Sequence, residues 1–369
     1  MPQADRWMNE ALALAARAVG LSEPNPRVGC VIVAADGERV LGQGHTQPAG
    51  QAHAEVMALR DAAARGADVR GATAYVTLEP CAHHGRTGPC CDALVAAGLG
   101  RVVASLTDPN PLVAGQGFAR LRAAGVAVET GPGARASREL NIGFFSRMVR
   151  GHPWVRLKIA ASLDGQTALD NGRSQWITGE AARADGHAWR ARAGALLTGI
   201  GTVLDDDPRL DVRLAPVGRQ PPLVVVDSRL QTPPAAALFC VPDRPVWIYA
   251  AQADAQAQAA LQARGAHVTL LPGAGGKVDL AALLKDLAGR GVNELHVEAG
   301  FKLNGSLLRE SLVDEFLVYL APRLLGSGRG MVAIGPLEDL AQGVALEFGP
   351  IERVGDDLRV LARVPGRDF

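Results

Sequence analysis

The sequence predicts a two-domain α/β protein, and three observations lead to this prediction. The chain has 369 residues, more than a single hydrophobic core usually organises. Short apolar runs that suit β-strands alternate with segments that have the apolar spacing of helices. The stretch 150–153 (RGHP) interrupts this alternation, and a new strand pattern begins directly after it. We therefore expect one domain in residues 1–150 and a second in residues 151–369.

The first half alternates strands and helices after an N-terminal amphipathic helix, which we expect from Asp5 to about Val19. A buried strand over 29–34 should turn at Asp36-Gly37 and return through ERVLGQG, and a loop should then deliver His53 to the start of a helix. Further strands are expected at 72–80, 101–106 and 126–130, and further helices at 90–98, 118–125 and 135–147.

The second half repeats the alternation. Its expected strands lie at 154–162, 195–201, 223–228, 246–250, 267–271, 294–300 and 315–322. The alanine-rich segment 250–265 should contain a surface helix. No G-x-G-x-x-G sequence follows any of these strands, so the pattern does not indicate a doubly wound dinucleotide-binding domain.

Composition and charge disfavour several classes of function. Lysine plus arginine and aspartate plus glutamate each number 38, so the formal net charge is zero. Long basic runs are absent, and a nucleic-acid surface therefore has no electrostatic signature in the composition. No apolar run is long enough to cross a bilayer, and charges interrupt the apolar core that an N-terminal signal peptide would need. We expect a cytoplasmic protein whose partner is neither a nucleic acid nor a membrane.

The five cysteines, an odd number, favour a reducing compartment in which thiols serve packing or metal binding. Cys30 lies in the apolar run VGCVIVA and suits a core position, whereas no pattern assigns a role to Cys240. The remaining three, Cys81, Cys90 and Cys91, follow a His-x-Glu sequence and are candidates for metal binding.

Two separated stretches of the sequence together predict one metal site. The first contains His53 and Glu55, and the second contains Cys81 and Cys90. One imidazole and two thiolates would hold zinc and leave a position open for water. Glu55 would stay free to move protons, as in zinc-dependent deaminases of nucleobase-like rings. A purely structural site needs a fourth ligand; Cys91 is available, but its adjacency to Cys90 makes joint tetrahedral coordination awkward. The free carboxylate favours a catalytic zinc.

The stretches PNPRVGCVIV, HAEV and TLEPCAHHGRTGPCCDALVAAG resemble the N-terminal half of the bifunctional riboflavin-biosynthesis deaminase–reductase family. The resemblance implies a cytidine-deaminase-like three-layer α/β domain that removes the 2-amino group of a diaminopyrimidinone ribosyl phosphate. It also implies that Asn25, His83 and Arg86 contact that substrate. The family places a histidine in a G-x-G-x-H context, which is displaced by one residue here, so either His45 or Thr46 would face the substrate.

In the second half, LKIAASLDGQTA, GRSQWITG, ALLTGIGTVLDDDPRLDVR, VVVDS and HVEAGFKLNGSLL resemble the reductase half of the same family. The resemblance implies a fold similar to dihydrofolate reductase and reduction of the substrate's ribose by NADPH. The implied cofactor contacts are Ala160, Trp176, Thr202, Asp206, Ser228 and the turn Gly300, Phe301, Lys302, Leu303, Asn304, Gly305, Ser306. The implied substrate contacts are Ser174, Arg190, Leu210, Arg213 and Glu298.

Backbone amides of the Gly300–Ser306 turn would cradle the cofactor's phosphates, and the two arginines suit the substrate's phosphate. Taken singly, Trp176 would suit a core and Asp205-Asp206-Asp207 a solvated turn, but the ordered set favours the site. Lys158 and Asp164 fall in matching stretches without an assigned role.

Three other interpretations stay open. A nucleic-acid or nucleoside base deaminase with an accessory domain would need a basic groove, and a non-enzymatic zinc scaffold would have no use for Glu55. One half could also be active and the other degenerate. Proteins similar to this one assemble through the reductase half, so we expect a homo-oligomer.

Overall fold

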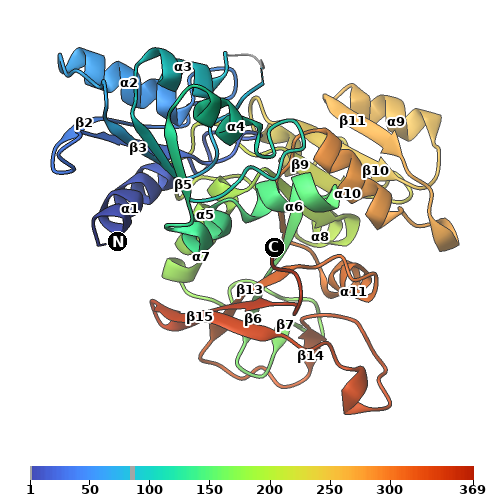
Figure 1. Cartoon of the computed structure of the whole chain (residues 1–369). Coiled ribbons are helices and arrows are strands. Elements are labelled where there is room, and N and C mark those ends of the chain that lie inside the picture. Colours follow the sequence, from blue (N-terminus) through green and yellow to red (C-terminus); the bar gives the residue numbers. More distant parts are fainter. Residues whose placement is uncertain (1, 84–87) are drawn as a thin grey trace. The chain divides into compact units, whose positions relative to one another are not determined.

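The computed structural model describes residues 2–83 and 88–369, and it forms two compact units, Met1–Gly151 and His152–Phe369 (Figure 1). Strands and helices alternate in both units, so the expected α/β class is confirmed. No helix in the described part of the chain is long and apolar enough to span a membrane.

Unit 1 is built on a five-stranded sheet in the order β2-β1-β3-β4-β5. Strand β1 runs antiparallel to β2 and β3, whereas β3, β4 and β5 run parallel to one another. All five residues of β1 are buried, which explains its unbroken apolar sequence. The strands are β1 (Gly29–Val33), β2 (Val40–His45), β3 (Thr73–Val76), β4 (Arg101–Ala104) and β5 (Ala127–Thr130).

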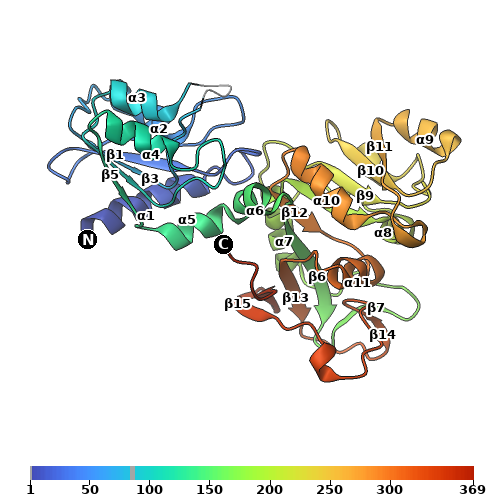
Figure 2. The same cartoon turned by 45° about the vertical axis from the view of Figure 1, so that its right-hand side comes forward.

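Helices cover both faces of this sheet and make a three-layer unit (Figure 2). Helix α3 packs beside α2 and α4 on one side, and α1 packs beside α5 on the other. The helices are α1 (Pro2–Ala16), α2 (Ala54–Ala64), α3 (Cys90–Ala96), α4 (Gln116–Ala123), α5 (Ala134–Leu140) and α6 (Ile142–Arg150).

The single helix expected over 135–147 is wrong, because the chain forms α5 and α6 with a break at Asn141. The backbone of Asn141 leaves helical geometry, with a φ of −110° and a ψ of 19°. Its buried side chain bonds to Arg27: Oδ1 accepts from the Arg27 amide at 2.7 Å, and Nδ2 donates to the Arg27 carbonyl at 2.9 Å. Asparagine side chains favour such local breaks because they bond readily to backbone groups.

Unit 2 contains a nine-stranded sheet in the order β11-β10-β9-β8-β12-β6-β13-β16-β15. The run from β11 to β13 is parallel, and β16 and β15 add an antiparallel edge. The strands are β6 (Trp154–Ser162), β8 (Ala195–Gly199), β9 (Leu223–Val226), β10 (Val246–Ala250), β11 (Ala266–Leu270), β12 (Glu294–Val297), β13 (Glu315–Ala321), β15 (Glu347–Val354) and β16 (Asp357–Arg363). A separate ribbon pairs β7 (Gln166–Leu169) with β14 (Gly328–Gly330).

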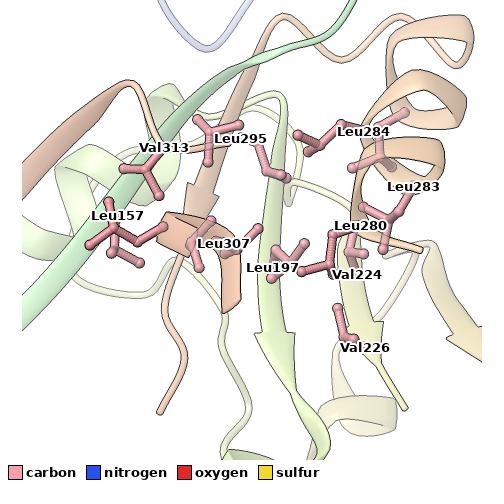
Figure 3. Packing of buried hydrophobic residues seen from close by; sticks show 14 of the residues in the cluster. Leu157, Leu197, Val224, Val226, Leu280, Leu283, Leu284, Leu295, Leu307 and Val313 are labelled. Carbon is pink, nitrogen blue, oxygen red and sulfur yellow. The ribbon is translucent and has the colours of Figure 1, made fainter. Parts of the chain in front are cut away.

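One large hydrophobic cluster of unit 2 lies between its parallel strands and helix α10, and a second includes residues of α8 and α9. Leu280, Leu283 and Leu284 of α10 face Leu197 of β8 and Val224 of β9, and all of these side chains are buried (Figure 3). The helices are α7 (Glu180–Arg192), α8 (Ile200–Asp206), α9 (Ala255–Gln262), α10 (Leu280–Gly289) and α11 (Phe301–Arg309), with short 3₁₀ turns η1 (Ala237–Cys240), η2 (Ala274–Gly276) and η3 (Leu340–Gln342). The alanine-rich segment contains α9, as predicted.

Candidate metal centre and cofactor cavity

Three metal-ligating atoms converge in unit 1. His53 Nδ1 lies 3.6 Å from Cys81 Sγ and 3.3 Å from Cys90 Sγ, and the three ligand groups lie within 4.8 Å of one another. A tetrahedral zinc with ordinary bond lengths places its nitrogen and sulfur ligands about 3.5 Å apart, so this donor set fits zinc. Residues 28 and 37 positions apart in the sequence thus form one site.

Two of the three candidate ligands lie at the N-terminus of a helix, and the third lies in the loop after a strand. His53 directly precedes α2, Cys81 follows β3, and Cys90 is the first residue of α3. The Cys90 amide donates a hydrogen bond to Cys81 Sγ at 3.3 Å. Hydrogen bonding from the Cys90 side chain is the largest cause that lowers the pKa of the Cys81 thiol to about 4, and His53 and the Cys90 amide add to it. Cys81 is therefore prepared to ligate as a thiolate.

Glu55 lies in the first turn of α2 and is only 4% exposed. Burial raises the pKa of its carboxyl to about 7, with a further contribution from the charge of Cys81. It is not a member of the ligand group. A carboxyl with a pKa near neutrality can both accept and return a proton.

The remaining cysteines of unit 1 lie apart from the ligand group. Cys91 is buried and directs its Sγ to the Asp92 carboxylate at 3.8 Å, so it does not close the site as a fourth ligand. Cys30 is fully buried in β1, and the expected core position is confirmed.

Two acidic residues beside the site were missed by sequence reasoning. Glu79 is buried and accepts amide hydrogens from Asp108 at 3.1 Å, from Gly115 at 2.9 Å and from Phe118 at 3.2 Å. It thereby ties the segment that carries Cys81 to the loop after β4. Burial raises the pKa of Asp108 to about 7, and the charges of Glu79, Cys81 and Glu55 add to this effect. A sequence signal for Asp108 was present. It lies in the TDPNP loop after β4, and β4 runs parallel to β3, so the loops after both strands meet at the same edge of the sheet.

The substrate contacts predicted for unit 1 lie in different environments. Asn25 lies half-buried in a turn closed by Ser22, and the buried Nδ1 of His83 has no hydrogen-bond partner among the described residues. Arg86 lies outside the described residues. Thr46 is buried and its hydroxyl accepts the Val28 amide hydrogen at 3.1 Å, which is a structural role.

His45 lines a separate shallow hollow with Leu14, Met57 and Arg60, and its Nδ1 lies 3.2 Å from Gln47 Nε2. Neither His45 nor Thr46 is part of the metal-ligand group.

Unit 2 contains a cavity of about 1660 Å³. Every cofactor and substrate contact expected from the sequence in this half lines it, with Gly305 as the exception. Trp176 is 60% exposed at its wall, so the alternative of a core tryptophan is wrong. Asp205 and Asp206 end α8 and line the cavity, and both are exposed to solvent.

The segment Gly300–Ser306 is not a turn, and that expectation is corrected. Gly300 precedes α11, and the residues after it form the first turns of that helix because Leu307 and Leu308 bury against the sheet. The free amides at a helix N-terminus still favour an anion. Gly305 lies in the helix interior, where a Cβ would stand 2.2 Å from the Ala333 carbonyl oxygen, so its role is close packing.

A charged cluster stands in the cavity wall where β6, β12 and α7 meet. Arg190 binds both carboxylate oxygens of Glu298, with Nη2 to Oε2 at 2.9 Å, and Lys158 Nζ lies 3.7 Å from Glu298 Oε2. Burial alone would raise the pKa of Glu298, but the charges of Arg190 and Lys158 outweigh it and hold that pKa well below its usual range. Lys158, which had no role in the sequence interpretation, is thus part of the cavity.

Two of the predicted residues have other partners than expected. Arg190 has its donors engaged by Glu298 and by the Asp211 carbonyl at 3.0 Å, so it is not free to clamp a phosphate. Arg213 Nη1 pairs with Asp211 at 2.5 Å, and its side chain is 51% exposed at the cavity rim. Asp164 accepts amide hydrogens from Leu325 and Gly326 and serves the turn after β6.

Comparison with known families assigns both units. The cytidine and deoxycytidylate deaminase zinc-binding region matches residues 1–106, and the RibD C-terminal domain matches residues 153–360. The chain is 45% identical to the riboflavin biosynthesis protein RibD of Escherichia coli, over 96% of this chain and 98% of that protein. It is 40% identical to RibD of Haemophilus influenzae, over 96% and 95%.

Solved structures agree with these matches. Acinetobacter baumannii RibD is 40% identical and superposes with a TM-score of 0.88, covering 98% of this chain and 99% of that one. A diaminohydroxyphosphoribosylaminopyrimidine deaminase/5-amino-6-(5-phosphoribosylamino)uracil reductase from Thermotoga maritima is 31% identical, with a TM-score of 0.87 and the same coverage. The expected folds are confirmed: a cytidine-deaminase-like N-terminal domain and a dihydrofolate-reductase-like C-terminal domain.

Proposed function

The chain belongs to the bifunctional riboflavin-biosynthesis deaminase–reductase family, and from this premise we propose which residues carry each reaction. The protein is a zinc-dependent deaminase and an NADPH-dependent reductase. The two reactions are deamination of 2,5-diamino-6-(5-phosphoribosylamino)pyrimidin-4(3H)-one and reduction of the ribose of the deaminated product to a ribityl chain. The observation that carries this function is a three-ligand zinc site with an uncoordinated Glu55 beside it.

Residues 1–150 carry the deamination. His53, Cys81 and Cys90 would hold the zinc, which when bound supplies Lewis-acid activation of water. Glu55 takes a proton from the attacking water and delivers it to the ring nitrogen. It then takes the second proton from the hydroxyl group added to the ring and gives it to the amino group, which departs as ammonia as the C–N bond breaks. Asn25, His83 and Arg86 bind the substrate. The raised pKa of Glu55 supports this proton transfer at neutral pH.

Residues 151–369 carry the reduction. NADPH would supply hydride, and the protein's part is to orient both ligands and exclude water. The free amides at the start of α11 suit the cofactor's phosphates. Arg213, exposed at the cavity rim, binds the substrate's phosphate, while Arg190 holds the Glu298 carboxylate toward the ribose.

The protein assembles as a homo-oligomer through unit 2 and works in the cytoplasm. Supporting this, residues 335–353 are all exposed, including Leu340 at 99% and Phe348 at 75%. An exposed apolar segment of this length at a sheet edge is uncommon in a monomer, and a second copy of the chain would cover it. Sedimentation of the wild type and of Phe348→Asp tests this, since a monomeric wild type refutes the assembly.

The function is tested by ammonia release from the zinc-loaded protein with the diaminopyrimidinone ribosyl phosphate, with and without NADPH. We expect ammonia without NADPH, and NADPH oxidation only after deamination. Ammonia without any NADPH oxidation would refute the reductase assignment. Neither signal, with zinc still bound, would favour the scaffold interpretation.

A further inference from the structure

The loop Arg209–Arg213 forms one wall of the unit 2 cavity, with Arg209, Leu210 and Arg213 in its lining. Leu210 has a φ of 48°, in the left-handed region that a leucine rarely adopts. Such a conformation persists only where the surroundings hold it in place.

Side chains from outside the loop stabilise its backbone through hydrogen bonds. The Gln220 side chain makes two hydrogen bonds with the Val212 backbone: its Oε1 accepts the Val212 amide hydrogen and its Nε2 donates to the Val212 carbonyl, each at 2.8 Å. His187 Nδ1 accepts the Arg213 amide hydrogen at 3.2 Å. The loop backbone is therefore held by side chains from outside the loop, which lie 8 and 26 positions away in the sequence.

A further support is Arg244, which lies two residues before the strand β10. It is 7% exposed, and its Nη1 donates to the Leu210 carbonyl at 2.7 Å while its Nη2 donates to the Leu238 carbonyl at 2.5 Å. Burial lowers the pKa of this guanidinium to about 10, which still leaves it charged at neutral pH. Burying a charge that is bonded to carbonyls rather than to a carboxylate is costly, and Arg244 does not itself line the cavity.

We propose that Arg244 is a positioning residue for the reductase reaction: it fixes the Leu210 carbonyl and so holds the wall that receives the phosphorylated pyrimidine. This rests on the proposed function, in which Arg213 binds the substrate's phosphate, and on the substrate contact that the family resemblance implies at Leu210. Arg244 acts through the loop and touches neither ligand.

A purely structural Arg244 would give a different result. Its second bond, to Leu238, joins η1, so its loss would lower thermal stability without a selective effect on one ligand. A positioning role predicts weaker binding of the pyrimidine. The affinity for NADPH should be unchanged, because the cofactor binds to other parts of the cavity, such as the start of α11.

The test compares the wild type with Arg244→Met and Arg244→Lys. Calorimetry measures the affinity for the ribitylamino product, cofactor fluorescence measures the NADPH affinity, and ammonia release by unit 1 serves as an internal control. Loss of one charge-assisted hydrogen bond should raise the dissociation constant of the product roughly tenfold in Arg244→Met. Arg244→Lys should restore part of it, with NADPH affinity and ammonia release unchanged.

Two further variants keep the test decisive. Arg264→Met is the matched control, because Arg264 contacts Phe239 of the same η1 turn from an exposed position and should leave both affinities unchanged. Gln220→Met removes the two bonds to Val212 and should show the same selective loss, so it carries the test if Arg244→Met does not fold.

Product affinity within twofold of the wild type in the folded variants would overturn the proposal, as would a parallel loss of NADPH affinity. A failure of the proposed function is distinguishable, because the wild type itself would then bind neither ligand.

Discussion

The backbone amide of Cys90 donates to the sulfur of Cys81 at 3.3 Å, so the first amide of α3 faces a metal ligand. The partial positive charge of a helix N-terminus favours the thiolate form. This contact links the cysteine after β3 to the one that begins α3 and explains how an eight-residue separation between them still yields one site.

Replacing Glu55 by glutamine should abolish ammonia release while zinc stays bound. The amide keeps the shape of the side chain but cannot carry the proton, and we expect a loss of about 10²–10⁴-fold. Metal analysis and NADPH oxidation with the deaminated substrate are the controls. Retained deamination would contradict the role of Glu55.

Removing zinc with a chelator should stop ammonia release but leave NADPH affinity unchanged, because the metal ligands all lie in unit 1. Returning zinc should restore the deaminase. The two activities are followed in one sample, and a parallel loss of both would show that unit 2 also depends on the metal.

Gly305→Ala should destabilise unit 2, since the new methyl group would stand 2.2 Å from the Ala333 carbonyl oxygen. Overpacking of this kind costs about 1–3 kcal/mol. Gly289→Ala at the end of α10 is the matched control, because nothing lies within 4 Å of its Cβ position. Denaturant unfolding measures both, and equal stabilities of the two variants would refute the packing role.

Arg156→Met should be among the most destabilising changes in unit 2. The Arg156 guanidinium is buried between Glu294 at 2.8 Å and Glu315 at 2.5 Å. Removing one member of a buried ion cluster costs about 3–5 kcal/mol, because the remaining charges lose compensation. The free energy of unfolding at neutral pH measures this, and Arg290→Met, which breaks a half-exposed pair with Asp286, should cost much less.

Unit 2 should lose stability as the pH falls from about 6.5 toward 4. Burial, with the charges of Arg190 and Arg213, lowers the pKa of His187 from 6.5 to about 4, and burial also lowers the pKa of His296. Between these pH values the two histidines are protonated in the unfolded chain but largely neutral in the folded chain, so protonation favours unfolding. Urea unfolding across this range gives the slope. His187→Gln should flatten part of it, and an unchanged slope would contradict the assignment.

Sequence alone determined most element types and the three residues that meet at the candidate metal centre. Strand β6 over 154–162 and strand β10 over 246–250 were predicted with their observed bounds. Strand β10 is a continuous apolar run, as buried parallel strands usually are, and in β6 apolar residues predominate around Arg156 and Lys158. His53, Cys81 and Cys90 were found because metal ligation demands particular side chains in a recognisable order. Strands β15 and β16 were missed: β15 is exposed along nearly its whole length and has no apolar face, and β16 buries only some of its residues near the sheet edge.

Only the tertiary structure decided what side chains do across long separations. It showed that Asn141 divides a helix by bonding to Arg27, that Arg190 is already engaged by Glu298, and that Arg244 supports Leu210. Local sequence carries the preference of the backbone for helix or strand. The partner of a buried polar group depends on which distant segment the fold brings within about 3 Å, and no local pattern encodes that.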